Sequence, residues 1–105
     1  MWLRAVEKYK AHYSLEEIKA AFSTAQKLRM SVTALLQINA LGLTRSDVVA
    51  SIQSLLCRDL YKSMTSYRDH RIWQDVYHVK YGRLLLYLKF TVDEQGYYII
   101  SFKEK

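Results

Sequence analysis

Residues 84–92 read Leu-Leu-Leu-Tyr-Leu-Lys-Phe-Thr-Val, and this stretch decides the fold class. Successive side chains of a β-strand point to opposite faces of a sheet, so alternation predicts one apolar side and one polar side. The apolar side consists of Leu86, Leu88, Phe90 and Val92, and the polar side of Tyr87, Lys89 and Thr91. We therefore expect a strand that faces a core on one side and water on the other.

The chain on either side of this stretch has the same β-branched and aromatic character. Turn signals at residues 80–83 and 93–96 divide it into segments. The strands that we predict run over residues 60–67, 72–79, 84–92 and 97–103. Because the connections between the last three are short, we expect antiparallel neighbours.

The first half of the chain has helical spacing instead. Ser14 and Glu17 form a capping box that predicts a helix over residues 15–28. A second helix is expected over residues 31–41, closed by Gly42 in a left-handed conformation, and a third from the Thr44 cap to about Leu56. The sequence therefore predicts an α+β fold with amino-terminal helices packed on a carboxy-terminal antiparallel sheet.

Composition and charge limit the kinds of partner that we expect the chain to bind. A chain of 105 residues with 50% hydrophobic content can bury one modest core, so we expect a single domain over residues 1–105. The net charge of +6 favours a polyanion, because lysines that neutralise phosphates release counterions. Aromatic residues gather in the second half, where 10 of 14 follow residue 60 and could stack on bases.

The sequence lacks the motifs that several other functions require. Cys57 is the only cysteine, which excludes an intrachain disulfide, and it ends an apolar helix, so we expect it to be buried. The histidines are scattered and no metal-binding spacing or glycine-rich phosphate loop is present, so we expect no metal and no cofactor. No signal peptide or 18-residue apolar run is found, and we expect a cytoplasmic protein without a membrane partner.

The polar face of the predicted sheet is where chemistry could occur. If the strands pair as expected, this face brings together Lys62, Gln74, Tyr87, Lys89 and Lys103. RNA cleavage requires that the ribose 2′-hydroxyl be oriented, that two protons move and that phosphorane charge be stabilised. Lysines, protonated at neutral pH, would supply the charge.

Each of these residues also has a purely structural interpretation. Lysines on a strand are more often solvated surface than catalytic groups, and Tyr87 could be an ordinary amphipathic sheet residue. Gln74 could bond a neighbouring strand. His70 titrates near neutral pH and is a reserve acid or base, yet beside Asp69 it could simply stabilise a turn.

Three motifs resemble a known family. They are Tyr-Lys-Ser-Met-Thr at 61–65, Ile-Trp-Gln-Asp-Val-Tyr at 72–77 and Ser-Phe-Lys-Glu-Lys at 101–105, with Tyr-Leu-Lys at 87–89. In this order and spacing the chain resembles the MqsR family of bacterial toxins from about residue 12 onward. Residues 78–82 form a turn at which members of the family differ.

The resemblance implies a RelE-like fold and a ribosome-independent mRNA interferase that cuts single-stranded message without a metal, at GCU-type sites. It implies a cognate antitoxin, and contact with DNA only through the antitoxin complex. The positions that match the family's catalytic residues are Lys62, Gln74, Tyr87 and Lys103. Those expected to hold substrate are Tyr61 and Met64, with Lys89 and the reserve residue His70.

Two alternatives from other classes use the same surface. A non-catalytic RNA-binding or ribosome-binding module would need the same basic, aromatic sheet. A scaffold that binds a partner by strand addition at an exposed sheet edge would need no RNA at all.

Overall fold

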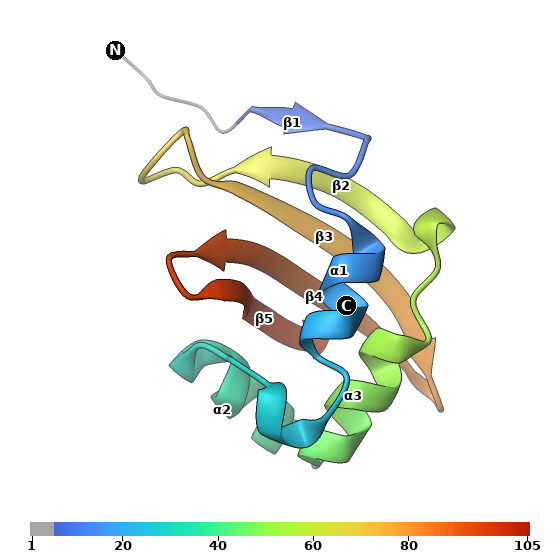
Figure 1. Ribbon diagram of the computed structural model, residues 1–105. Coiled ribbons are helices and arrows are strands. Elements are labelled where there is room, and N and C mark those ends of the chain that lie inside the picture. Colours follow the sequence, from blue (N-terminus) through green and yellow to red (C-terminus); the bar gives the residue numbers. More distant parts are fainter. Residues whose placement is uncertain (1–5) are drawn as a thin grey trace.

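The computed structural model describes residues 6–105 and consists of a five-stranded antiparallel sheet with helices on one side (Figure 1). The strand order is the chain order, β1-β2-β3-β4-β5. The strands are β1 Glu7–Lys8, β2 Leu60–Thr65, β3 Trp73–Tyr81, β4 Leu84–Asp93 and β5 Gly96–Glu104. The helices are α1 Leu15–Ala21, α2 Val32–Ala40 and α3 Arg45–Gln53, and short 3-10 turns cover Ala25–Lys27 and Cys57–Asp59.

The predicted α+β fold is confirmed, and so are its four long strands. The strand β1 was not predicted, because two residues carry no readable alternation. It exists through its pairing with β2, in which Glu7 lies opposite Met64 and Lys8 opposite Ser63. The backbone of Val6 continues this contact, since its N–H donates to Thr65 Oγ1 at 2.7 Å.

Two helices are shorter than predicted. The helix expected over residues 15–28 ends at Ala21, and the chain bends at Ser23 and Thr24, residue types of lower helix propensity, before the 3-10 turn Ala25–Lys27. The helix expected to reach Leu56 ends at Gln53. Cys57 therefore lies in a 3-10 turn and is exposed, so the expectation that it is buried was wrong.

The predicted caps Ser14, Thr44 and Gly42 are present, but at Ser14 only one half of the predicted capping box forms, since no bond from Ser14 N to the Glu17 side chain is made. Ser14 and Thr44 each accept a hydrogen bond from the backbone three residues on, and Asp47 completes a reciprocal capping box with Thr44. Gly42 closes α2 with a φ of +70°, as expected for a left-handed cap. These local signals could be interpreted correctly because each depends on neighbours within one helical turn.

The core lies between the sheet and the three helices, each of which contributes buried residues to it. Leu86, Leu88 and Phe90 are fully buried, as the alternation predicts. Val92 is 37% exposed, because the strand has by then passed the helices, and Thr91 is buried, with its hydroxyl donating to the Trp73 carbonyl at 2.8 Å. The division of the strand into a buried face and a wet face was therefore wrong for its last two residues.

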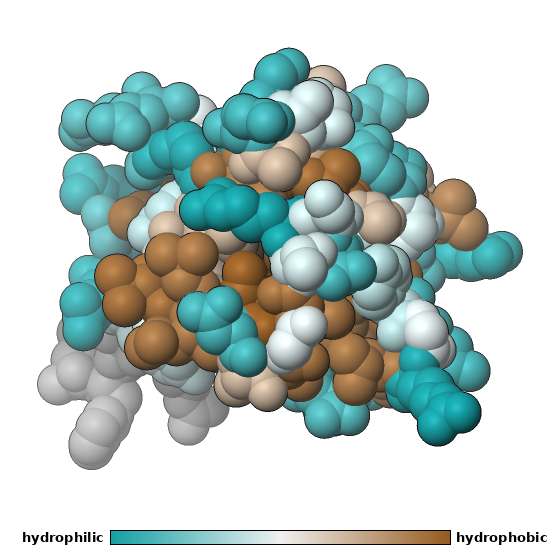
Figure 2. Space-filling view, turned by 90° about the horizontal axis from the view of Figure 1, so that it is seen from below, coloured by the Kyte–Doolittle hydropathy of each residue, from teal (hydrophilic) through white to brown (hydrophobic). Residues whose placement is uncertain are grey.

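The helix α2 lies along the outer edge of β5. Gln37 Oε1 accepts hydrogen bonds from Phe102 N at 2.8 Å and from Ser101 Oγ at 3.1 Å, so part of this sheet edge is covered. Figure 2 shows apolar side chains on the surface at this end of the molecule, where Val32 and Leu36 of α2 are exposed. In the described part of the chain, none of the helices has the length and apolar character of a membrane span.

Candidate active site

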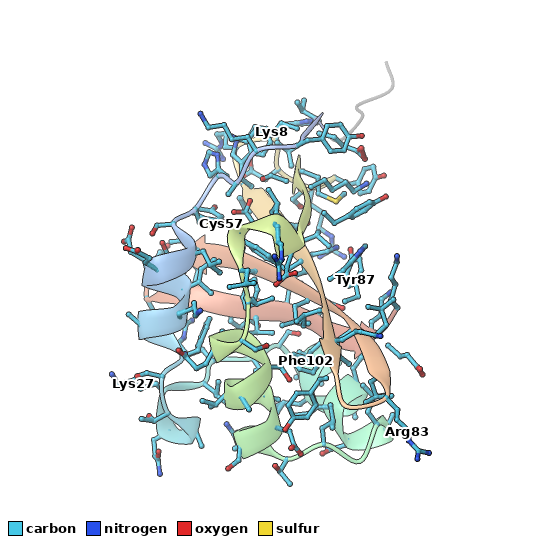
Figure 3. All side chains as sticks on the ribbon, turned by 90° about the vertical axis from the view of Figure 1, so that its right-hand side faces the viewer. Lys8, Lys27, Cys57, Arg83, Tyr87 and Phe102 are labelled. Carbon is cyan, nitrogen blue, oxygen red and sulfur yellow. The ribbon has the colours of Figure 1, made fainter. Side chains whose placement is uncertain are left out.

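The face of the sheet that α1 and α3 leave uncovered is called the open face below. Figure 3 shows Tyr87 pointing away from the helices, whereas Phe102, on the neighbouring strand, is in the layer between the sheet and the helices. Alternation along each strand then assigns the other members. They are Lys62 and Met64 of β2, Gln74, Val76, His78 and Lys80 of β3, Leu85, Tyr87 and Lys89 of β4, and Ser101 and Lys103 of β5.

The strand register arranges these side chains in rows across the sheet. One row runs from Lys62 through Val76 and Lys89 to Ser101. The next row runs from His78 through Tyr87 to Lys103. Side chains directly opposite one another lie about 5 Å apart at Cβ, so these two rows form a compact cluster.

Three lysines converge on this cluster. Lys103 Nζ lies 5.0 Å from the centre of the Tyr87 ring, and Lys89 Nζ lies 5.8 Å from it. Lys62 comes from the other side, over Tyr61, with its ammonium 5.3 Å from that ring. A phosphate that approaches Tyr87 would therefore meet positive charge from three strands.

The lysines differ in their electrostatic environment. The pKa of Lys62 is raised above its ordinary value, chiefly because Glu7 accepts a hydrogen bond from its ammonium at 2.7 Å. The pKa of Lys89 is lowered, first by burial and then by the charges of Lys103 and Lys62. Lys62 is thus held as a cation, while Lys89 is the lysine closest to losing its proton.

The tyrosine at the centre keeps its proton. Burial raises the pKa of Tyr87, and the charge of Lys62 only partly opposes this effect. The phenol is therefore protonated at neutral pH, and it can donate a hydrogen bond or a proton to an oxyanion.

Gln74 and Met64 lie opposite each other at one end of the open face. Val76 separates Gln74 from His78, and four residues of strand span about 13 Å. Gln74 is therefore on the expected face, one row beyond Lys62 and Lys89 and two rows from Tyr87. It would contact a neighbouring part of an extended ligand.

Tyr61 and His78 extend the cluster toward β2. Their rings stack with centroids 4.5 Å apart and planes 20° from parallel, and the His78 ring centroid is 5.7 Å from that of Tyr87. His78 was not predicted as a site residue, because the three histidines show no metal-binding spacing. Alternation along β3 puts His78 on the same face as Gln74 and Val76, and this pattern would have identified it.

His70 lies in the turn between β2 and β3. Asp69 in this turn pairs with Arg71 at 3.0 Å. Within residues 6–105, Nε2 of His70 is buried and has no hydrogen-bond partner. The structure thus places His70 beyond the strand ends, away from the register positions of Tyr87 and Lys103.

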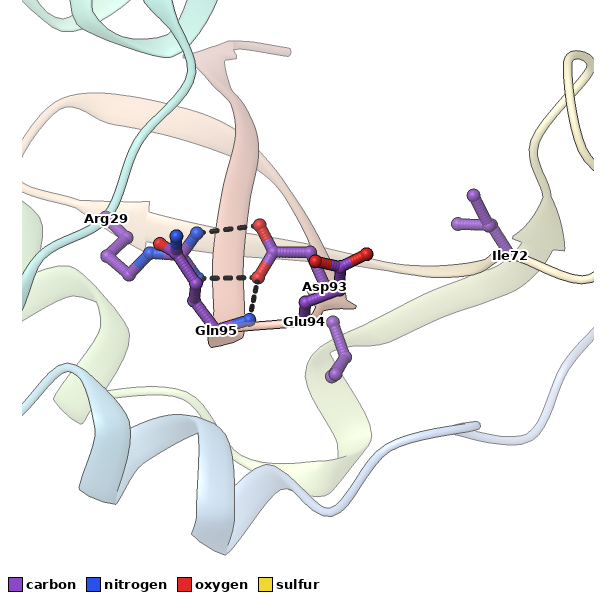
Figure 4. A pocket seen from close by; sticks show the side chains of 6 residues that line it. Arg29, Ile72, Asp93, Glu94 and Gln95 are labelled. Atoms are coloured by element: carbon purple, nitrogen blue, oxygen red, sulfur yellow. Dashed lines mark hydrogen bonds and ion pairs between the residues drawn. The ribbon is translucent and has the colours of Figure 1, made fainter.

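Two hollows of the described surface lie away from the cluster around Tyr87. One has a volume of about 360 Å³ and is lined by Arg29, Ile72 and residues 92–95 (Figure 4). Its arginine is bound by both carboxylate oxygens of Asp93, at 2.9 and 2.6 Å, so its charge is already balanced. The other, of about 460 Å³, lies beside Ala25 and Arg45. Neither hollow is lined by a residue of the cluster around Tyr87.

Within residues 6–105, no group of three or more histidine, cysteine, aspartate or glutamate side chains is placed to hold a metal ion. The groups that the open face offers are ammonium ions, phenols, an imidazole and an amide. These can neutralise a phosphate, orient hydroxyl groups and transfer protons.

A small α+β domain with a cationic, tyrosine-lined sheet face belongs to the class of proteins suited to bind a phosphate-bearing chain. More specifically, residues 10–104 match the family described as motility quorum-sensing regulator, toxin of MqsA, and the chain belongs to this family. It is 41% identical over 100 residues to the mRNA interferase toxin MqsR of Escherichia coli (strain K12), which covers 95% of this chain and 100% of that protein. The family resemblance expected from the sequence is confirmed. The matched region begins at residue 10, so Glu7 lies outside it.

Proposed function

We propose that this chain is a ribosome-independent mRNA interferase toxin that cuts single-stranded message in the cytoplasm without a metal. The observation that carries the proposal is the convergence of Lys62, Lys89 and Lys103 around Tyr87 on an uncovered sheet face. The relationship to a protein named an mRNA interferase toxin supports a nuclease rather than a simple binder.

The chemistry would use the substrate's own nucleophile. The ribose 2′-hydroxyl attacks the adjacent phosphate, the bond to the 5′-oxygen breaks, and the products carry a 2′,3′-cyclic phosphate and a 5′-hydroxyl. The lysines stabilise the dianionic phosphorane, and the Tyr87 phenol donates to a phosphate oxygen or to the leaving oxygen. Gln74 lies farther along β3 from Tyr87, and it orients a neighbouring nucleotide.

Substrate binding would extend along the open face from this centre. Tyr61 is 48% exposed and offers a ring to a base, and Met64 lies beside Gln74 as an adaptable apolar contact. Sites of GCU type are proposed by family resemblance. His70, at the turn, is at most a distant contact for a longer RNA.

A cognate antitoxin of the kind in the family's description, toxin of MqsA, would silence this toxin. Contact with DNA would occur only through the complex with that antitoxin. An antitoxin that covered the open face would neutralise the lysines directly, and one that bound elsewhere would need to alter their arrangement.

The test uses purified protein and a single-stranded RNA with a GCU site, in EDTA. Wild-type protein should give fragments with 5′-hydroxyl ends, and Lys62→Ala and Tyr87→Phe should cut at least about 100-fold more slowly while folded by circular dichroism. Lys27→Ala, on the helix side (Figure 3), is the matched control and should cut normally. RNA that is shifted in a gel but intact would contradict the proposal and support a non-catalytic binding module.

A further inference from the structure

His78 occupies the middle of the open face. Its ring is stacked on Tyr61 of β2, and its neighbour across β4 is Tyr87. The His78 ring centroid lies 4.5 Å from that of Tyr61 and 5.7 Å from that of Tyr87. The imidazole is therefore placed between these two rings, beside the residue on which the lysines converge.

The nitrogens of this ring are available. Among the described residues, no hydrogen bond to the His78 ring is formed, and because the residue is only partly buried its nitrogens reach solvent. His12 differs, because its Nδ1 lies 2.9 Å from Lys8 Nζ and its ring stacks on Trp73. His78 is thus the imidazole of the open face that is free to exchange a proton with a ligand.

We propose that His78 is a catalytic residue of the cleavage reaction, the general base that removes the proton from the ribose 2′-hydroxyl. The inference rests on the proposed function. The reaction needs a proton acceptor, and protonated lysines, a protonated tyrosine and a glutamine do not supply one. His78 would fill this role.

The proton balance of the step is complete. The 2′-hydroxyl proton passes to a ring nitrogen of His78 as the 2′-oxygen bonds to phosphorus. The bond between phosphorus and the 5′-oxygen breaks, and that oxygen takes the phenol proton of Tyr87. The ring centroids of the two residues are 5.7 Å apart, so the two groups can contact opposite sides of one phosphate. Imidazolium and phenolate then exchange the proton through water, and no co-reactant is consumed.

The groups around His78 favour its neutral form. It faces Tyr61 from β2 and Tyr87 from β4, and Lys105 adds positive charge after β5, while Lys80 follows on its own strand. Burial first, and then the charge of Lys105, lower its pKa below the ordinary value of 6.5. A neutral imidazole can accept a proton at pH 7, as a protonated lysine cannot.

The carboxylate that contacts a lysine of the open face is already engaged. Glu7 accepts the ammonium proton of Lys62 at 2.7 Å, which lowers its capacity to act as a base. The proton acceptor of the open face is therefore the imidazole.

The experiment compares wild type with His78→Gln and His78→Ala on the same RNA. Both variants should lose about 100-fold or more in kcat. An RNA with a 2′-deoxy substitution at the cut site cannot react, so it reports binding alone. Its Kd should change by less than about 3-fold, which corresponds to about 0.6 kcal/mol. The control is His12→Asn, on the helix side of the sheet, which should retain the wild-type rate.

Three readouts separate catalysis from a structural role. The wild-type rate should fall as the pH decreases through a midpoint below 6.5, and this acid limb should disappear in His78→Gln. Added imidazole should partly restore the rate of His78→Ala, which leaves a gap between two rings. NMR of the His78 ring protons should give the same midpoint as the kinetics.

The outcomes are distinguishable from those that test the proposed function. If wild-type protein cuts RNA but His78→Gln keeps its rate and its acid limb, the assignment of His78 is wrong while the nuclease stands. Loss of binding to the unreactive RNA in step with the rate would also overturn it, because His78 would then be a stacking residue. If wild-type protein does not cut at all, the proposed function itself fails.

Discussion

The carboxylate of Glu7 lies 2.7 Å from the ammonium of Lys62, across the pairing of β1 with β2. This places an acidic group against one of the lysines that converge on the candidate site. The lysine side chain is 18% exposed and the glutamate 40%, so the pair is screened only in part. RNA must compete with Glu7 for Lys62 or bind beside it.

Substitution Glu7→Gln should strengthen RNA binding. The change removes a negative charge but leaves an amide oxygen that can accept from Lys62, so β1 should remain docked. We expect Kd to fall by about 2- to 5-fold at low salt, a gain typical of one partly exposed charge. Fluorescence anisotropy with an unreactive RNA measures this, and the salt dependence should become steeper. Glu94→Gln, in the exposed turn after β4, is the charge-matched control, and weaker binding by Glu7→Gln would contradict the expectation.

Substitution Lys89→Met should stabilise the protein while it weakens RNA binding. Lys89 is partly buried between two other lysines, and a methionine of similar length removes the cost of that charge. We expect the free energy of unfolding to rise by about 1 kcal/mol at pH 7, measured by urea denaturation. Lys80→Met, exposed on β3, should change it less.

The difference in the free energy of unfolding between Lys89→Met and wild type should depend on pH, with a definite sign. The pKa of Lys89 is lower in the folded protein than its ordinary value of 10.5 in the unfolded chain, so protonation favours unfolding. Wild-type protein should therefore gain stability relative to Lys89→Met as the pH rises from the lowered pKa toward 10.5. A stability difference that grows over this range would be inconsistent with a desolvated cation.

Substitution Asp75→Ala should release the amino-terminal segment. The fully buried Asp75 carboxylate accepts from His12 N at 3.2 and 3.0 Å and from Tyr13 N at 2.9 Å. Losing these bonds should cost about 2–3 kcal/mol and should speed amide exchange in residues 6–13. Asp69→Ala, in an exposed turn, should cost much less, and Asp75→Asn should be intermediate because one acceptor remains.

Substitution Gln37→Leu should loosen the strand that carries Lys103. The Phe102 N–H donates to Gln37 Oε1 at 2.8 Å, and leucine has no acceptor. We expect a loss of about 1 kcal/mol and faster exchange of the Phe102 amide, with smaller effects from Gln26→Leu on the exposed surface. An unchanged Phe102 exchange rate would show that the contact does not hold β5.

Much of the helix layer and of the sheet could be predicted from local signals. Caps such as Thr44 with Asp47 involve residues within one turn, and the alternation of Leu86 to Phe90 is a property of any strand with one buried face. The predictions failed where local rules compete with packing. The helix from Leu15 stops at Ala21, and Thr91 is buried by a bond to the neighbouring strand.

By itself, the sequence determined the α+β class, the family and the face on which Lys62, Tyr87, Lys89 and Lys103 lie, because alternation needs no knowledge of the neighbouring strand. Only the tertiary structure decided which residues of that face meet. Register joins positions far apart in the chain, so it set His78 beside Tyr87 and left Gln74 at the far end. The pairing of Glu7 with Lys62 spans 55 residues, and no periodicity within either segment encodes it.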